Sequence, residues 1–497
     1  MRWNLSKVRA MACHGPSCSL VILLAAAAGP ALAQDAVVYP LGRIGLHALS
    51  VLHPALVYRP IDTFSGRPGA DALGMGGAYL ASASGAAALG WNVAGIADLE
   101  HLSFTFDGYS RATSAGVGDY PDSIVITGQS TLRFLSYRPS LKGGFVPSFI
   151  AAAGPLWTSG ERRLVGAFGW RHYAEMAVPE QAVSDLVPGG VGATFPIVFS
   201  TDRSERGSLE AFSPALAFRA GRTLSVGAVL NVLGGGVRAN TDERWASYGA
   251  TTRANTRYSG LSPEFGGRAS FGPSVSLGLH LVPGYTLKVR DGTYSRRAAA
   301  IPPSPQYIVT ATLADYDLTI PAAFGAGVAF RPSPRLLIAA DMNAQSWSKA
   351  KVKYTKAPPD SVGLPLADVT TLHFGAEYKL LRTSWGEVPV RIGFRTAPLG
   401  YLDVDRRDLV PDTISTPQGS LLRWSYHGKQ PKANAYSFGA SLDTPGIRYD
   451  VGFERISYEQ NKWFFDIPSD QLVNPGMTTV KVKQKVSKIR LSATYTF

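Results

Sequence analysis

The sequence predicts an all-β protein, an antiparallel transmembrane β-barrel of about 14 strands with an N-terminal plug, or hatch, inside its lumen. Three observations carry this prediction: a final strand with one apolar and one polar face, an N-terminal export signal, and a series of tight turns between alternating runs. The composition agrees, because 52 Gly, 34 Pro, 21 Tyr and 22 Phe suit many strands, many turns and aromatic girdles at the membrane interfaces. We therefore expect the protein in the bacterial outer membrane.

The last strand, residues 489–497, alternates between apolar and polar side chains. Successive strand side chains point to opposite faces, so Ile489, Leu491, Tyr495 and Phe497 share a lipid-facing side while Arg490 faces the lumen. A soluble edge strand would show the same alternation. Bacterial outer-membrane barrels resemble this C-terminus closely, and in them the barrel-assembly machinery reads a final strand that ends in Phe. Tyr495 and Phe497 are accordingly the candidate assembly signal.

The chain begins with a predicted signal peptide over residues 1–33. Arg2, Lys7 and Arg9 form a positive start, residues 20–28 are apolar, and residues 31–33 are a small-residue cleavage site. The apolar run is too short to cross a bilayer as a helix, and no later stretch approaches the roughly 20 apolar residues that a transmembrane helix needs. Export without a membrane helix fits an outer-membrane, periplasmic or secreted protein.

Removal of the signal changes both the thiol content and the charge of the chain. Cys13 and Cys18 are lost with it, so the mature chain has neither disulfides nor thiol chemistry. The formal net charge falls from +13 to +10, because three basic residues and no acidic residue are removed. Export and the absence of a dense basic helix favour lipopolysaccharide phosphates over nucleic acid as the anionic partner.

Short turns separate pairs of alternating runs and set the number of strands. We expect hairpins at residues 157–162, 220–222, 282–285, 332–334, 382–387 and 444–446. With an opening strand near residues 102–106 and the closing strand, these hairpins predict fourteen strands, an even number as such barrels require. An extra hairpin within residues 121–140 leaves sixteen strands open. The segments between are predicted to be long outward loops, near residues 113–142, 177–207, 239–264, 297–317, 354–367, 399–432 and 461–485.

Strand alternation also predicts a network of charged side chains in the lumen. Opposite charges meet across adjacent inward faces, so we favour a structural lattice of ion pairs in the lower barrel over a water-conducting ion pathway. The predicted members are Asp341, Glu377, Arg391, Arg395, Asp450, Glu454, Lys488 and Arg490.

Three lysines lie on the lipid-facing parity of the last strand, above its apolar part. They are Lys481, Lys483 and Lys485. Ten residues at about 3.3 Å each, on a strand tilted by about 40°, climb roughly 25 Å from Phe497, which is the height of the apolar band. We expect these lysines to contact lipopolysaccharide phosphates; an ordinary solvated strand extension is the alternative.

Two runs rich in small residues, 69–83 and 86–97, precede the first strand. Dense Gly and Ala allow close backbone packing, as a compact plug inside a barrel requires. The glycines at 74–77 do not form a phosphate-binding loop, because no GxxxxGK[ST] pattern follows. The expected domains are a signal peptide at 1–33, an N-terminal extension and hatch at 34–99, and the barrel at 100–497.

These runs resemble the FadL/TodX-like family of outer-membrane transporters for hydrophobic compounds and the related PorV-type barrels. The residues that match the family's N-terminal hatch motifs are Gly74, Met75, Gly76, Gly77, Ala78, Asn92, Ala94 and Gly95. Further matches are residues 321–332, which lead to Asp341 and Trp347, and residues 374–378 and 388–393. Val93 stands where the family has proline, and Ser84 and Gly85 stand where members carry acidic residues.

The resemblance implies passive uptake of a hydrophobic small molecule, such as a long-chain fatty acid or a hydrocarbon, by a monomeric barrel. Capture between outer loops, an apolar pocket above the hatch and sideways exit at a kinked strand belong to that implication. A secretion-accessory role like that of PorV, or a structural barrel, is the alternative, and a solid interior would favour either. No GxSxG, HExxH or clustered His appears, so we expect no catalysis, no metal and no cofactor.

Overall fold

The structure is a computed structural model, and it describes most of the chain beyond residue 66. The described ranges are 67–116, 120–126, 129–140, 144–175, 180–187, 197–245, 248–300, 307–312, 315–354, 362–363, 366–384, 386–400, 409–416, 419–426, 429–465 and 477–497. The predicted signal peptide and residues 34–66 lie outside them. None of the helices in these ranges is long and apolar enough to span a membrane.

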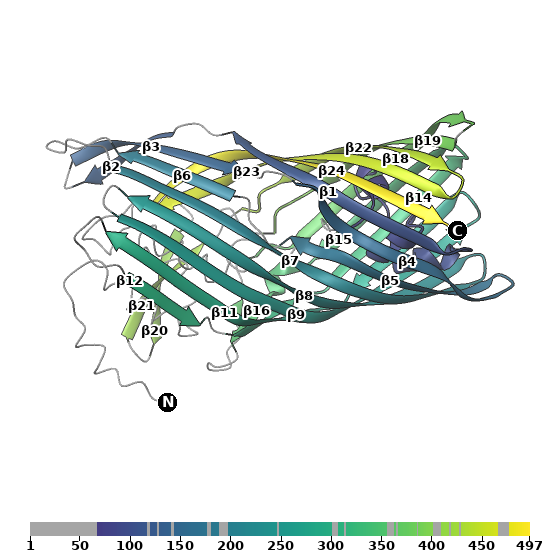
Figure 1. The fold of residues 1–497 in the computed structure, drawn as a ribbon, viewed down its shortest axis with the longest axis horizontal. Coiled ribbons are helices and arrows are strands. Elements are labelled where there is room, and N and C mark those ends of the chain that lie inside the picture. The colour runs from purple at the N-terminus through teal and green to yellow at the C-terminus, as the bar shows by residue number, and fades with distance from the viewer. Residues whose placement is uncertain are drawn as a thin grey trace.

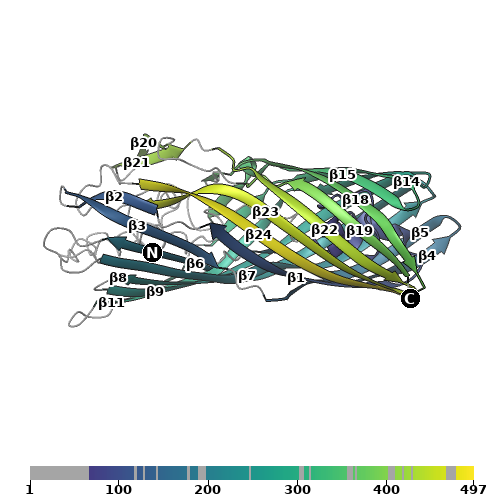
Figure 2. The ribbon, with the colours of Figure 1, turned by 90° about the horizontal axis from the view of Figure 1, so that it is seen from above.

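Antiparallel strands form a closed ring, in which each strand pairs with the next and the last pairs with the first. The ring is β1 (Ser103–Gly116), β4 (Val146–Ser159), β5 (Arg162–Glu175), β7 (Ile197–Ala220), β8 (Leu224–Trp245), β9 (Tyr248–Phe271), β10 (Val275–Val282), β14 (Ala323–Ser333), β15 (Leu336–Gln345), β18 (Val369–Thr383), β19 (Gly386–Thr396), β22 (Ala433–Thr444), β23 (Ile447–Phe465) and β24 (Met477–Thr496). Pairing of Ser103 with Thr496 closes it. The barrel therefore has the predicted 14 strands, and Figures 1 and 2 show its long axis lying horizontally.

The remaining elements extend or decorate this ring. The further strands are β2 (Tyr120–Ile126), β3 (Gln129–Ser140), β6 (Glu180–Val187), β11 (Tyr285–Ala300), β12 (Tyr307–Thr312), β13 (Tyr316–Ile320), β16 (Lys351–Tyr354), β17 (Val362–Gly363), β20 (Leu409–Thr416) and β21 (Gly419–Tyr426). The helical turns are α5 (Ala70–Gly74), η1 (Ala86–Gly90), η2 (Val93–Asp98) and η3 (Trp347–Lys349). The extra hairpin expected within 121–140 exists as β2 and β3, but β3 pairs with β6, so no strand is added to the ring.

Many of the predicted outer loops are wrong, because the strands continue through them. Residues 239–245 belong to β8 and residues 248–264 to β9, and the two strands remain paired up to Trp245 and Tyr248. Residues 461–465 and 477–485 likewise belong to β23 and β24. The polar residues of these segments predict loops, but a strand that has left the lipid no longer needs an apolar outer face.

The predicted hairpin at 282–285 is also wrong. The chain reverses earlier, at residues 272–274, where Gly272 has the positive φ of 64° that a tight turn requires. At Pro283 and Gly284 the chain instead continues in the same direction from β10 into β11, and both strands pair with β9. One turn replaces the other, so the strand number is unchanged.

The sheet has an interruption at this point, which we call the wall break. The β9 ladder ends with Phe265 opposite Leu281 and resumes with Gly260 opposite Leu287. Between these two points, residues 261–264 of β9 and residues 282–286 are not paired with each other. All of these residues lie within the described range 248–300. Pro263 and Pro283 lie within the wall break, and neither can donate a backbone hydrogen bond.

Buried and exposed residues alternate along the ring strands, and this alternation separates the lumen from the membrane face. On β15, for example, Leu337 and Ala339 are buried while Ile338 is exposed. Large exposed apolar residues occur around the ring, among them Leu216, Phe265, Leu279, Ile392 and Leu491. An apolar outer belt on a closed antiparallel sheet is the structure by which strands cross a bilayer, because every backbone group in the ring can be paired.

Candidate functional site

The hatch, residues 67–99 of the described chain, lies inside the barrel at the end that holds the C-terminus (Figure 1). Its short turns α5, η1 and η2 contain mostly Ala and Gly and contact the inner faces of strands around the ring. Gly76, with φ of 67°, packs against the backbone of β18 and β19. A Cβ at Gly393 on β19 would collide with the backbone of Met75 and Gly76, so this wall glycine admits the hatch.

The residues of the predicted hatch motif are all buried. They are Gly74, Met75, Gly76, Gly77, Asn92, Ala94 and Gly95. Asn92 is the N-cap of η2, and its Oδ1 accepts a hydrogen bond from Ala94 N at 3.2 Å. Its Nδ2 donates to Leu80 O at 2.9 Å and to Gly267 O on β9 at 3.0 Å. One amide thus joins two parts of the hatch and ties both to the wall.

Side chains of the wall also bind the backbone of the hatch directly. Asp341 Oδ2 on β15 accepts hydrogen bonds from Tyr79 N at 2.6 Å and from Leu80 N at 2.8 Å. The other contacts of this kind are Gly69 N to Asp107, Ala70 N to Ser492, Gly74 O to Ser437, Gly76 O to His373, Ala83 O to Arg268, Asp98 O to Arg163 and Arg67 O to Arg490. These partners are distributed around the ring, so the hatch is held on all sides.

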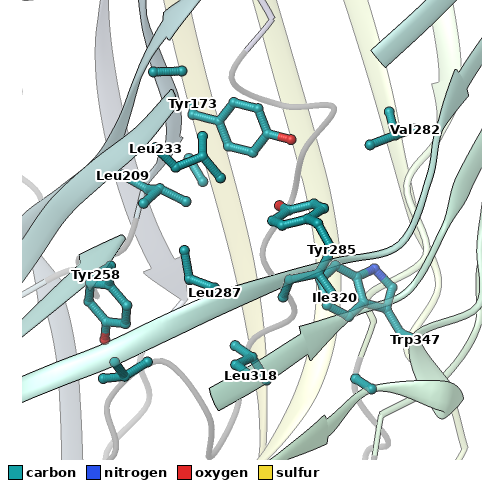
Figure 3. Packing of buried hydrophobic residues seen from close by; sticks show 14 of the residues in the cluster. Tyr173, Leu209, Leu233, Tyr258, Val282, Tyr285, Leu287, Leu318, Ile320 and Trp347 are labelled. Atoms are coloured by element: carbon teal, nitrogen blue, oxygen red, sulfur yellow. The ribbon is translucent and has the colours of Figure 1, made fainter. Parts of the chain in front are cut away.

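Above the hatch, the inner face of the barrel is lined with apolar side chains. Figure 3 shows them converging from several strands. The cluster comprises Tyr173, Ala174, Leu209, Ala211, Leu233, Val237, Tyr258, Val282, Tyr285, Leu287, Val289, Tyr316, Leu318, Ile320, Ala323, Trp347, Ala350 and Leu366. Because inward positions of an outer-membrane barrel are ordinarily polar, this inner apolar cluster is a departure that needs a function.

The comparisons with known proteins agree with this geometry. The chain matches no protein-family model and no curated protein sequence. Among solved structures, it is similar to a Pseudomonas aeruginosa FadL homologue, with 14% identity, a TM-score of 0.57, and 89% of this chain and 99% of that chain covered. The Ralstonia pickettii toluene transporter TbuX gives 14% identity, a TM-score of 0.50 and coverage of 87% and 100%. The Pseudomonas putida toluene transporter TodX gives 13% identity and a TM-score of 0.50, with 89% of this chain and 99% of that chain covered.

The protein has the FadL/TodX-like fold. The closed 14-stranded ring and its apolar outer belt place this FadL/TodX-like barrel in the bacterial outer membrane.

Several predicted site residues in the lumen, at the end that holds the hatch, form one charged network. Arg391 Nε contacts Glu377 Oε2 at 2.7 Å, and its Nη1 lies 3.5 Å from Asp450 Oδ1. Arg448 joins this group to the hatch, because its Nη2 lies 3.6 Å from Asp71 Oδ2 and its Nε contacts Asp450 at 2.9 Å.

The other predicted lumen charges lie in neighbouring clusters of the FadL/TodX-like barrel. Arg395 forms a two-pronged ion pair with Glu454, at 2.8 Å and 3.1 Å. Lys488 is opposite Glu454 in the β23–β24 ladder, and Arg490 Nη1 is 3.3 Å from Asp107 Oδ1. Asp341 is not part of these ion pairs and binds hatch amides instead. Buried ion pairs of this kind fix the positions of the hatch and the strands relative to one another more than they add to the free energy of unfolding.

A polar layer lies between the hatch and the inner apolar cluster, and the sequence analysis does not predict it. Glu264 on β9 contacts Arg171, and its two oxygens lie 2.8 Å from Asn231 Nδ2 and 3.0 Å from His280 Nε2. His280 Nδ1 is 3.1 Å from Arg67 Nη2 of the hatch. Burial lowers the pKa of Arg67 to about 10, so it remains protonated at neutral pH. The sequence signal that indicates this layer is the inward parity of Arg171 and Glu264 on their strands. Among the residues that the structure describes, no group of three or more His, Cys, Asp or Glu side chains could hold a metal.

The last predicted sites lie at the two ends of β24. Tyr495 and Phe497 are exposed and stack edge to face, with ring centroids 4.4 Å apart. Phe497 N donates to Leu102 O at 3.0 Å across the closing seam. Lys483 and Lys485 are exposed on the outward parity, and Lys483 Nζ lies 3.9 Å from Glu459 Oε1. Lys481 belongs to β24 opposite Asn461, while its side chain lies outside the described part.

Proposed function

We propose that the protein is a passive transporter that takes up hydrophobic molecules, such as long-chain fatty acids or hydrocarbons, across the outer membrane. The observation that carries the proposal is the inner apolar cluster, which lies above a hatch that is bound to the wall. The FadL homologue and the toluene transporters of the same fold support it. An apolar solute meets a polar lipopolysaccharide layer outside, and each buried methylene contributes about 0.8 kcal/mol to its transfer onto such a lining.

Release sideways through the wall break is the second part of the proposal. A downward path would have to break the wall contacts that hold the hatch, including those of Asp341 and Asn92. Opening the wall break breaks no ladder between its two edges, because residues 261–264 and 282–286 are not paired with each other. Val282 and Tyr285 of the inner apolar cluster lie within the wall break, and Leu261, also within it, is exposed on the outer face. A solute leaving here passes from an apolar lining into the membrane without crossing water.

Uptake by matched leucine variants tests the apolar lining. Leu287 on β11 faces inward in the cluster, whereas Leu279 on β10 faces outward with 53% exposure. Leu287→Gln places an amide in the lining, which costs about 1–3 kcal/mol when unpaired, so uptake of subsaturating fatty acid, alkane or toluene should fall about tenfold. Leu279→Gln should leave uptake per folded barrel unchanged. Equal uptake by the Leu287 variant and wild type, with both barrels heat-modifiable, would refute the transport proposal.

A disulfide across the wall break tests the exit. Because both native cysteines lie in the predicted signal peptide, the introduced cysteines have no competing thiols in the mature chain. Pro263→Cys with Gly284→Cys spans the break, while Gly267→Cys with Leu279→Cys joins the same strands where their ladder is intact. We expect oxidation to block uptake in the first pair only, and reduction to restore it. Full uptake with the first pair quantitatively oxidised would rule out this exit while leaving the transport proposal standing.

The proposal also includes roles for the other predicted sites. The hatch motif supports ligand-linked movement of the hatch, Tyr495 and Phe497 are read by the barrel-assembly machinery, and Lys481, Lys483 and Lys485 contact lipopolysaccharide. We also propose the division into a signal peptide at 1–33, an N-terminal extension and hatch at 34–99, and a barrel at 100–497, acting as a monomer.

A further inference from the structure

A cluster of exposed basic side chains covers the outer face of the barrel beside and above the wall break. We call it the basic face and define it as Arg238 on β8, Arg253 and Arg257 on β9, Lys288 on β11, and Lys351 and Lys353 on β16. All six side chains are exposed. The β8–β9, β9–β11, β11–β13 and β13–β16 ladders place their strands side by side, so the charges form one surface; Figure 1 shows β8, β9, β11 and β16 in this neighbourhood.

Strand parity shows that the basic face points away from the lumen. On β9, Arg257 and Arg253 share the parity of the exposed Leu261 and Phe265. Tyr258, which follows Arg257, has the opposite parity and is buried in the inner apolar cluster. On β11, Lys288 is exposed between the buried Leu287 and Val289. The charges therefore meet whatever surrounds the barrel.

The height of the basic face corresponds to the head-group layer of the outer leaflet. From the turn at Phe271 to Leu261, the last apolar outward residue of β9, the strand rises about 25 Å at 3.3 Å per residue and a tilt of about 40°. Arg257 lies about 10 Å higher by the same geometry. The apolar stretch thus equals the thickness of the hydrocarbon band, and the basic face begins directly above it.

The basic face carries more positive charge than its own acids balance. Arg238 is opposite Arg206, another exposed arginine, and Arg257 is opposite Arg290. Like charges that face each other across a ladder destabilise it unless an anion lies between them. The described acids nearby include Asp291, 3.6 Å from Arg257, Asp315, which accepts a hydrogen bond from Asp291 N at 3.3 Å, and Asp317, which Arg290 engages at 2.5 Å.

We propose that the basic face is a binding site for the phosphate groups of lipopolysaccharide. Phosphorylated glycolipid is the anion that the outer leaflet presents at this height, and guanidinium groups bind phosphate oxygens in pairs. The acyl chains would then lie on the outward residues Leu261 and Phe265, and the sugar phosphates on Arg238, Arg257 and Lys288. The site is separate from the lysines of β24 and does not depend on the transport proposal.

Charge reversal tests the site. Arg238→Glu, Arg257→Glu and Lys288→Glu are combined in one variant, and Arg331→Glu, Arg335→Glu and Arg382→Glu, exposed positions near the opposite end, form the matched control. Lipopolysaccharide retained per folded barrel after detergent extraction and chelator washing is measured by phosphate analysis and native mass spectrometry. We expect at least a tenfold loss in the first variant and wild-type retention in the control.

Three further outcomes decide the chemistry and the source of the phosphate. Wild type should bind purified lipopolysaccharide but not its dephosphorylated form, and it should bind vesicles of phosphatidylglycerol more weakly. Undiminished retention by the first variant, equal binding of dephosphorylated lipopolysaccharide, or equal binding of phosphatidylglycerol would each overturn the proposal. If the triple variant does not give a heat-modifiable barrel, Arg257→Gln alone must lower retention, and wild-type binding must weaken as sodium chloride is raised.

Discussion

Replacing Asn92 with alanine should loosen the hatch while leaving the barrel intact. The amide is fully buried and makes three hydrogen bonds, to Ala94 N, Leu80 O and Gly267 O. At about 0.5–1.5 kcal/mol each, their loss weakens docking of the hatch by roughly 1.5–4.5 kcal/mol. Since 1.4 kcal/mol corresponds to a factor of ten, the population of undocked hatch should rise at least about tenfold.

The assay is maleimide labelling of a cysteine placed at Ala97, a fully buried hatch residue. With Asn92→Ala, labelling from the periplasmic side should accelerate by at least about tenfold, and uptake should change, while heat modifiability stays at the wild-type value. Asn434→Ala, at an exposed asparagine of β22, is the control and should change neither the labelling rate nor uptake. Unchanged labelling in a folded Asn92→Ala barrel would show that these hydrogen bonds do not hold the hatch.

Three more outcomes follow from the structure. Deleting Phe497 removes the ring contact with Tyr495 and the backbone bond to Leu102, so folded protein in outer-membrane fractions should fall sharply; normal heat-modifiable levels would count against the assembly signal. Glu264→Gln leaves Arg171 without its counter-charge and should destabilise the barrel by about 3–5 kcal/mol, whereas Glu161→Gln, in an exposed pair with Arg222, should cost at most about 1 kcal/mol in thermal unfolding. Replacing Lys481, Lys483 and Lys485 with Glu should lower lipopolysaccharide retention without unfolding; equal retention would leave them as a solvated strand extension.

The two-residue period of strands made much of the barrel predictable. It assigned Ile489 and Leu491 to the membrane face and Arg490 to the lumen, as the structure has them, because one face of each strand must match lipid. Small residues likewise indicated the hatch, since only they permit backbone contact such as that of Gly76 with β19.

Tertiary structure alone decided where the regular pattern fails and which distant residues meet. Pro283 and Gly284 have the sequence of a turn, but their strand continues because β9 pairs with both β10 and β11. Beyond the lipid the outer face of a strand is free to be polar, so the upper halves of β8 and β9 carry no signal that separates them from loops. The series of contacts from Arg171 through Glu264 and His280 to the hatch residue Arg67 required the closed ring, because local pattern carries no information about which strands face one another across a lumen.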